Sequence, residues 1–474
     1  MKTLMRALTL SLLVLITGSA SAQRERARAF LDSTIERMGG AAKLAAVKQA
    51  RFEYMTQWMR TSFENRPFGD AVGSYEIDVD LRDYTAPAWR NTRRPIRQGS
   101  AAPLEIVNVI RDTVASFKAT TVAAGWQPLS AAYLDERTEV FTFSPERVLP
   151  LAREAGDAAM IADTIVGGAT YRRVRATISG IPTTLLFTGS EPLLTAAVYR
   201  AEQAKDFGLA PWGPMLVEVW YSRWARTASG ILFPANIDVA RVGRPYKRLQ
   251  MMAVDLAANI AADSFAVADS TRAAFARTQN RAMHDLPLDS ARLVESRFAE
   301  FRTNGAPVGA IRLGSAWWLL ETGTAPMNAE RVDRWLRDHT DGGRVAGAIV
   351  TSASTNNGGV AWLAKNQLPI RAGAATATHL TPMLTNRGLS SKSITVARKR
   401  ETIAVGADTA ILEPIDFPDA PGSLLVYVPR ERWLYFTPGS PLQTEIAMRR
   451  AKALGWRVEK LGSARGLAQP APAQ

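Results

Sequence analysis

The side chains that most often carry out metal and nucleophilic chemistry are scarce in this chain. Its 474 residues include no cysteine, and the three histidines are His284, His339 and His379. The lack of cysteine excludes disulfides, thiolate zinc sites, cysteine nucleophiles and iron–sulfur clusters. Three histidines that far apart in sequence cannot supply a multi-histidine metal centre, which leaves hydroxyl and carboxylate side chains as candidates.

The sequence motifs of serine hydrolases and nucleotide-binding proteins are also absent. A nucleophile elbow needs Gly-x-Ser-x-Gly, and Gly439-Ser440-Pro441 fails because the fifth position is Gln443. Neither a Walker A motif nor G-x-G-x-x-G occurs. Four carboxylates do lie close in sequence and could surround a hard cation such as Mg²⁺ or Ca²⁺: Asp408, Glu413, Asp416 and Asp419.

The elements that must position such groups change character along the chain. After a predicted helix over 24–38, polar and apolar side chains alternate over 52–58 and 75–82, which is typical of half-buried antiparallel strands. Ser179-Gly180 predicts a tight hairpin, and Ser144 before Pro145 predicts a capped helix over 145–154. Residues 23–267 are therefore expected to form a helix plus a large curved antiparallel sheet with one apolar face.

Strands and helices alternate in the second half. Residues 268–299 are predicted to be linker or helix, and residues 300–466 a second domain. Asn328 is predicted to cap a helix, and the run over 345–351 is apolar enough to be a strand covered on both faces. The fold class is α+β with two domains. The tail over 467–474, rich in Ala, Pro and Gln, is predicted to be disordered.

The N-terminus has the pattern of a secretory signal peptide. Lys2 and Arg6 precede an apolar run over 7–16, and Ala20-Ser21-Ala22 supplies the small residues that a signal peptidase accepts. The run is shorter than the roughly 20 residues that a membrane span needs. We expect residues 1–22 to be removed near Ala22–Gln23, leaving a soluble periplasmic or secreted bacterial protein without a transmembrane helix.

The chain is basic, with a formal net charge of +14. Its densest basic runs lie over 90–97 and at Arg398-Lys399-Arg400. Neither run is interleaved with aromatic residues, and no nucleic-acid-binding motif is present. We expect both runs to be solvated surface and expect no nucleic acid partner.

Four short segments in the second half keep a fixed order. They are Leu320-Glu321-Thr322-Gly323, V-T-S-A-S-T-N-N-G-G-V over 350–360, P-D-A-P-G-S over 418–423, and Y-F-T-P-G-S over 435–440. This series resembles the L-I-D-T-G, T-H-x-H-x-D-H-x-G-G-V, G-H-T-P-G-S and L-F-x-G-D motifs of the metallo-β-lactamase superfamily. The fifth motif of that superfamily, P-G-H-G with its last histidine, would fall around 462–466, where this chain has Ser463, Ala464 and Arg465. The resemblance covers about residues 300–466 and implies a four-layer αββα sandwich.

The resemblance also implies that the metal ligands are lost. In that family imidazoles and a carboxylate hold zinc, which makes hydroxide from bound water near neutral pH. The corresponding positions here are Thr351, Ala353, Thr355 and Asn356 in one register, or Ser352, Ser354, Asn356 and Asn357 in the other, with Asp419 and Ser440 further on. Hydroxyl and amide oxygens bind zinc weakly. We therefore expect a degenerate pocket at Thr351, Ser352, Ser354, Asn356, Asn357, Asp419 and Ser440, without metal, cofactor or catalytic residue.

The first domain carries a weaker resemblance. Met38-Gly39-Gly40-Ala41-Ala42-Lys43-Leu44, leading into strand, is similar to the start of periplasmic domains like the outer-membrane lipoprotein carriers. Those are curved half-barrels that hold acyl chains on the concave face. Four tryptophans are candidates to line such a cavity, although aromatic residues on strands are more often core: Trp58, Trp126, Trp220 and Trp224.

Three functions remain open at this point. The first is a pseudoenzyme that binds a small molecule, a lipid or a protein partner in the degenerate cleft. The second is an active hydrolase with an atypical site, such as a hard metal at the four carboxylates. The third is a periplasmic lipid- or lipoprotein-binding module led by the first domain.

Overall fold

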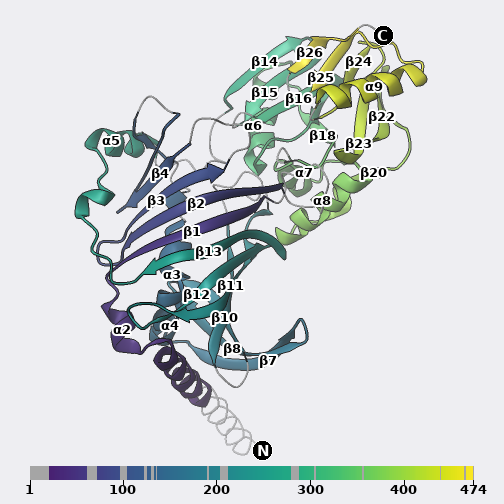
Figure 1. Ribbon diagram of the computed structural model, residues 1–474. Helices are drawn as coiled ribbons and strands as arrows, with labels where there is room; N and C mark the ends of the chain where they lie inside the picture. Colours follow the sequence, from purple (N-terminus) through teal and green to yellow (C-terminus); the bar gives the residue numbers. More distant parts are fainter. Residues whose placement is uncertain are drawn as a thin grey trace, which may run out of the picture. The chain divides into compact units, whose positions relative to one another are not determined.

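The chain divides into two units in the computed structural model (Figure 1). The structure describes residues 21–60, 72–96, 104–121, 125–129, 133–134, 136–188, 192–202, 212–278, 288–303, 306–354, 357–437, 439–463 and 466–472. Unit 1 comprises Met1–Met59, Gly73–Ala201 and Met215–Asn280, and unit 2 comprises Arg60–Val72, Glu202–Pro214 and Arg281–Gln474. The second unit thus takes two segments that the sequence assigned to the first domain. Each unit is described by itself below.

Unit 1 is built on one sheet, and its strands pair antiparallel from β2 through to β6 and from β1 through β13 to β7. The strand order is β6-β5-β4-β3-β2-β1-β13-β12-β11-β10-β9-β8-β7. The bounds are β1 Gln49–Arg60, β2 Val72–Asp83, β3 Ala88–Ile96, β4 Ile106–Arg111, β5 Val114–Ala119, β6 Gln127–Pro128, β7 Ala159–Val166, β8 Ala169–Ile178, β9 Ile181–Thr188, β10 Leu193–Ala201, β11 Met215–Arg226, β12 Leu232–Arg241 and β13 Arg244–Asp255.

Local sequence explains much of this unit. Residues 21–38 are helical, followed by α2 Ala41–Ala46, α3 Glu136–Thr142, α4 Pro145–Glu154 and α5 Asp269–Thr278. The hairpin at Ser179-Gly180 is present, since both residues have positive φ and Ile178 pairs with Ile181. Ser144 is the N-cap residue of α4 but makes no capping hydrogen bond with its side chain. Its hydroxyl is used elsewhere, as described below.

The sheet face predicted to be apolar is not the more buried face of β2. Glu76, Asp78, Asp80 and Arg82 are buried, whereas the apolar residues between them are only half-buried. Alternation fixes which side chains share a face, but not which face the rest of the fold covers. Here the α3–α4 segment is bonded to the charged face, because Arg82 donates to the Val140 carbonyl and the Ser144 hydroxyl.

Unit 2 contains two further sheets. The first has the order β14-β15-β16-β17-β18-β19-β20, antiparallel up to β17 and parallel from β17 to β20. The second has the order β21-β22-β23-β24-β25-β26. The bounds are β14 Ser290–Glu295, β15 Phe298–Thr303, β16 Ala306–Leu313, β17 Ala316–Leu320, β18 Val345–Val350, β19 Ile370–Gly373, β20 Ile394–Ala397, β21 Glu401–Val405, β22 Asp408–Phe417, β23 Ala420–Val428, β24 Trp433–Tyr435, β25 Lys460–Ser463 and β26 Gly466–Pro470.

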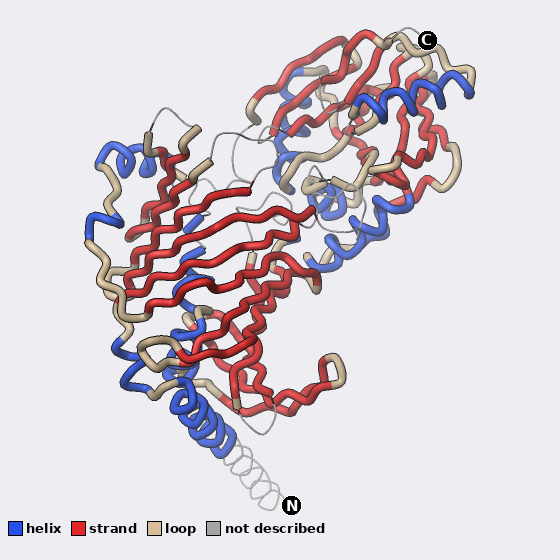
Figure 2. Tube along the Cα trace, viewed as in Figure 1, coloured by secondary structure: helices blue, strands red, loops and turns tan. Residues whose placement is uncertain are grey.

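The two sheets of unit 2 pack face to face and are covered by helices, as Figure 2 shows. The helices are α6 Pro326–His339, α7 Val360–Lys365, α8 Ala374–Asn386 and α9 Pro441–Ala453. Strand β23 shows the layering, because Leu424 and Val426 join the core between the sheets whereas Leu425 and Tyr427 join the core beneath α9. Trp335 of α6 contacts Phe301 on the other sheet. The fold of unit 2 is therefore an αββα sandwich, as expected.

Two expectations for unit 2 are corrected. The tail predicted to be disordered forms β26 over 466–470, because Leu467 is buried in the core between the sheets. Asn328 is not the N-cap residue of α6. It lies in the first turn, and its side-chain oxygen accepts a hydrogen bond of 2.8 Å from the N–H of Ala325, which is the N-cap residue.

Candidate functional site

The ends of β17, β18 and β24 bring polar side chains together inside unit 2. Strands β17 and β18 are parallel neighbours, so their carboxyl ends meet at one edge of the sheet. Glu321 follows β17, Thr351 follows β18, and Thr437 lies just after β24 in the facing sheet. All three are buried, with Glu321 and Thr351 at 0% exposure. We call Glu321, Thr351, Ser352 and Thr437 the hydroxyl cluster.

One carboxylate oxygen organises the hydroxyl cluster. Oε1 of Glu321 accepts hydrogen bonds from the Thr351 N–H at 2.9 Å, the Thr351 hydroxyl at 2.6 Å and the Thr437 hydroxyl at 3.1 Å. The Thr437 oxygen also lies 2.8 Å from the Thr351 oxygen and 2.9 Å from Oγ of Ser352. Because donors surround one oxygen from both sheets, the carboxyl group ties the sheets together at this edge.

The backbone of Glu321 has a conformation that a non-glycine residue rarely adopts. Its φ is +62°, in the left-handed region, which costs of order 1–2 kcal/mol for an L-residue. Its N–H donates to the Ile349 carbonyl at 3.1 Å. The hydrogen bonds to the side chain and backbone offset this cost, so the carboxyl group is fixed in place.

Burial raises the pKa of Glu321 to about 7, although the hydrogen bonds from Thr351 and Thr437 oppose the shift. The other oxygen, Oε2, has no hydrogen-bond partner among the described residues. A buried carboxylate without a cation is costly, and protonation removes that cost. We therefore assign the proton of the neutral form to Oε2.

The glycines that frame the cluster are required by close backbone approach. A Cβ at Gly358 would lie 2.4 Å from the Thr324 carbonyl carbon, and one at Gly359 would lie 2.1 Å from the Thr322 oxygen. The loop after β17 thus presses directly on the loop after β18. This packing gives both glycines a structural reason that does not depend on a metal.

The structure places the other predicted site residues in two groups. Asn357 is buried and its amide donates to the Ser352 carbonyl at 3.2 Å. Asp419 and Ser440 meet at Gln443, whose amide nitrogen donates to Asp419 at 2.8 Å and whose backbone N–H donates to the Ser440 hydroxyl. Ser354 lies in the bend after Ser352. The predicted site residue Asn356 lies outside the described residues.

Ser440 has a structural role in this arrangement. It is the N-cap residue of α9, and Gln443 bonds back to the N–H groups of Gly439 and Ser440. Such a capping box contributes about 1 kcal/mol to helix stability. Among the cluster residues, sequence analysis noted Glu321 and Thr437 only as parts of motifs and assigned neither to the site. An acid directly after a buried apolar strand was the available signal for Glu321.

The described residues at these strand ends do not fit a zinc ion. The fold resemblance implies zinc, and zinc takes imidazole, thiolate or carboxylate ligands. The described part of the chain holds no group of three or more His, Cys, Asp or Glu side chains that could bind a metal. Near these strand ends, the buried side-chain oxygens without a partner among the described residues are Glu321 Oε2 and Asn357 Oδ1, which are one acid and one amide.

The hypothesis of a hard metal at four carboxylates is wrong. Asp408 pairs with Arg297 and Arg430, and Glu413 pairs with Arg400 and Arg450. Asp416 accepts from the Gly422 N–H at 2.7 Å, and Asp419 accepts from Gln443. Each carboxylate therefore has its own partners, and the four do not converge.

The described histidines are not at these strand ends. His339 lies at the end of α6, with its ring stacked on Trp335 and Nδ1 at 2.9 Å from the Trp335 carbonyl oxygen. His379 is buried in α8, edge-on to the Trp212 ring. His284 lies outside the described residues.

A second buried polar group lies in unit 1, and sequence analysis missed it. Asp78 accepts from the Thr56 hydroxyl at 2.6 Å and from the Asn91 amide at 3.0 Å. The same amide donates to Asp80 at 2.9 Å, and Asp80 pairs with Arg82 at 2.9 Å. Burial and the charge of Glu76 raise the pKa of Asp78 to about 7.

The charges of unit 1 continue onto α3 and α4. Arg82 donates to the Ser144 hydroxyl at 2.8 Å, which itself donates to Glu146. Glu139 of α3 pairs with Arg241 at 2.7 Å and Lys247 at 3.2 Å. Of the tryptophans considered for an apolar cavity, Trp58 donates its indole N–H to Glu76. This side of the sheet is therefore lined with charge around Trp58.

Comparisons with known proteins show similarity of fold only. No protein-family model matches the sequence, and no curated protein sequence matches it. A metallo-β-lactamase from Pontibacter korlensis is similar at 14% identity and a TM-score of 0.30, over 37% of this chain and 90% of that one. An outer membrane lipoprotein-sorting protein domain from Vibrio parahaemolyticus is similar at 7% identity and a TM-score of 0.32, over 51% and 97%.

A stereoselective inverting sec-alkylsulfatase from Pseudomonas sp. is similar at 11% identity and a TM-score of 0.32, over 40% of each chain. This chain therefore spans less than half the length of the sulfatase. Within the described residues, no helix combines the length and apolarity needed to cross a membrane. The similarities concern fold alone, so function is argued from the side chains.

Proposed function

We propose that the chain is an exported bacterial protein that binds a ligand or partner without catalysis, with unit 2 as a hydrolase-type scaffold that has no metal site. The observation that carries this proposal is the state of Glu321. It is the carboxylate at the meeting strand ends, and one of its oxygens already accepts three hydrogen bonds from the protein.

A metal at this position would have to compete with those bonds. Metal ligation requires the deprotonated carboxylate, whereas burial favours the protonated form of Glu321. The hydroxyls of Thr351, Ser352 and Thr437 supply no negative charge. The cluster is therefore better suited to joining the two sheets than to activating water.

Two parts of the proposal rest on the sequence. Export is supported by the signal-peptide pattern over 1–22, of which residues 1–20 lie outside the described residues. The proposed ligand is a small molecule or a lipid, and a protein partner is the other candidate. An acyl-chain carrier is less well supported, because the buried side of β2 presents Glu76, Asp78 and Asp80.

The proposal is tested on the full mature chain. The protein is dialysed against a small excess of Zn²⁺, then against buffer, and its metal content is measured beside hydrolysis of a β-lactam, a phosphodiester and a sulfate ester. We expect well under one zinc per chain and no turnover sensitive to a chelator. The variant H339A is the control that identifies zinc held by an exposed histidine. Stoichiometric zinc with turnover abolished by the chelator would overturn the proposal.

A further inference from the structure

A pocket on unit 2 is lined mainly by cations from separate elements. It has a volume of about 440 Å³ and is bounded by Arg398, Lys399, Arg400, Glu413, Pro414 and Arg450. The first three residues form the turn between β20 and β21, Glu413 and Pro414 belong to β22, and Arg450 belongs to α9. The fold thus adds Arg450 to a basic run that sequence alone assigns to solvated surface.

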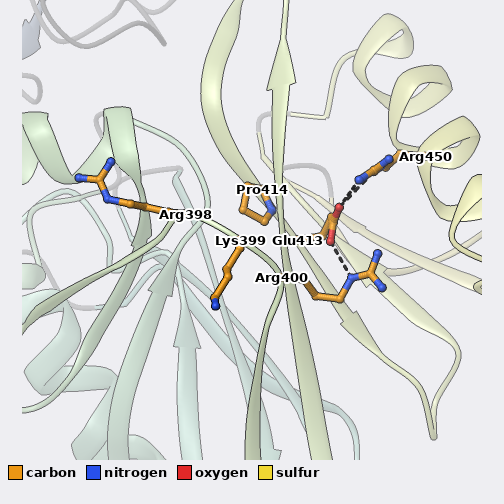
Figure 3. Close-up of a pocket in the computed structure, with 6 residues that line it drawn as sticks. All are labelled: Arg398, Lys399, Arg400, Glu413, Pro414 and Arg450. Carbon is orange, nitrogen blue, oxygen red and sulfur yellow. Dashed lines mark hydrogen bonds and ion pairs between the residues drawn. The ribbon is translucent and has the colours of Figure 1, made fainter.

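Two of the guanidinium groups are held in place by Glu413. Its carboxylate accepts from Nε of Arg400 at 2.8 Å and from Nε of Arg450 at 3.1 Å. Figure 3 shows Arg400 and Arg450 approaching Glu413 from different sides. Arg400 also lies over the Trp456 ring, with its guanidinium carbon 5.8 Å from the ring centre. The side chain of Glu413 is 5% exposed, whereas Arg400 and Arg450 are 48% and 45% exposed.

The cations of the pocket exceed what Glu413 can neutralise. Four cations and one carboxylate line it, which leaves a formal charge of +3. Arg398 and Lys399 are exposed and form no ion pair with any residue that the structure describes. In Figure 3 both point away from Glu413, and because both are exposed they can turn toward an incoming anion. Arginine forks match the oxygens of phosphate in a bidentate manner.

We propose that Arg398, Lys399, Arg400 and Arg450 form a binding site for a phosphate-bearing anion, in which the Glu413 carboxylate orients the two fixed guanidinium groups. The site is distinct from the hydroxyl cluster and does not depend on the proposed absence of metal. A free polyphosphate and the headgroup of an anionic lipid share this chemistry, and the experiment separates them.

The test uses the full mature chain with two probes, inorganic pyrophosphate measured by calorimetry and vesicles of phosphatidylglycerol with phosphatidylcholine measured by sedimentation. The double variant R398A/K399A removes two cations that pair with no described residue, so the fold is expected to survive. We expect it to weaken binding at least tenfold, since each surface charge contributes about fivefold at close range. The matched control R334A removes an exposed arginine of α6 and should leave binding unchanged.

A second variant tests the role of Glu413. E413Q keeps an acceptor oxygen between Arg400 and Arg450 but removes the internal anion, so the pocket gains one positive charge and binding should become several-fold tighter. The expected order of affinity is E413Q above wild type, and wild type above R398A/K399A. If pyrophosphate binds in this order, the ligand is a soluble anion. If only the vesicles bind, in the same order, the ligand is a lipid headgroup. Absence of binding to both probes, or equal losses in R334A and R398A/K399A, would overturn the proposal.

Discussion

Two glutamates, one in each unit, show how differently this chain treats a carboxyl group removed from water. Glu139 of unit 1 is 19% exposed on its side chain and faces Arg241 and Lys247. Glu321 of unit 2 is fully buried and faces hydroxyls. Burial alone would raise both pKa values, but Lys247 and Arg241 hold the pKa of Glu139 at about 2, whereas that of Glu321 rises to about 7.

The difference teaches that the partners decide whether burial neutralises the group, because cations outweigh burial at Glu139 and hydroxyls do not at Glu321. Glu139 stays ionised over the physiological range, and its stabilising contribution, present above its unfolded pKa, is lost only as the pH falls toward about 2. Glu321 has a raised pKa, so its folded form retains a proton that the unfolded form releases. Its contribution therefore falls as the pH rises from the unfolded value through about 7.

The largest effect is expected from breaking the charged arrangement. R241M removes a guanidinium group that is 2% exposed and leaves Glu139 with Lys247 alone, which should cost about 3 kcal/mol of unfolding free energy. The double variant E139Q/R241M should recover more than half of that loss. Urea unfolding, with hydrogen exchange of peptides covering 136–154, measures both. A loss below 1 kcal/mol in R241M would show that the pairing does not matter.

The next effect concerns pH. The pKa of Glu321 lies near 7 in the folded chain and near 4 in the unfolded chain. Wild type should therefore lose about 2 kcal/mol of unfolding free energy between pH 5 and pH 8 through this group. E321Q should abolish that loss. Asp78 has the same direction of shift in unit 1, so D78N is the matched variant there. Parallel pH profiles for E321Q and wild type would contradict the raised pKa.

Much of the scaffold was predictable, but neither glutamate's environment was. The Ser179-Gly180 hairpin and the alternating run of β2 are local patterns. The burial of the Asp78 side of β2 depends on α3 and α4, which follow far along the chain, and Glu139 finds Arg241 across a separation of 102 residues. The motif series predicted the αββα layers and the position of Thr351, but not that Thr437 would bond to it from the other sheet.

A smaller effect is expected from single hydroxyls. T351V keeps the shape of the side chain but removes the donor to Glu321, which should cost about 1–2 kcal/mol and raise the pKa of Glu321 further. T395V alters an exposed threonine of β20 and is the control, with little change expected. Thermal unfolding at pH 6 compares them. Equal stability of T351V and wild type would show that the hydroxyl cluster does not stabilise unit 2.

The smallest effect is expected for a pair that stays in water. Arg334 and Glu330 lie one turn apart on α6, with side chains 64% and 50% exposed, so R334A should change stability by less than about 0.5 kcal/mol. The same unfolding assay compares the loss of unfolding free energy in R334A with that in R241M. The difference shows how much more a buried ion pair contributes than an exposed one. A loss in R334A similar to that in R241M would contradict the comparison.

The carboxyl group of Glu321 can be observed directly. Carbon-13 NMR of glutamate-labelled chain, with E321Q assigning the signal, gives its pKa with and without Zn²⁺. We predict a midpoint near pH 7 that added zinc leaves unchanged, because three of the protein's own donors already occupy Oε1 and burial favours the protonated form. A midpoint below pH 4, or a shift of the signal at one equivalent of zinc, would contradict a closed hydroxyl cluster and restore a metal site at these strand ends.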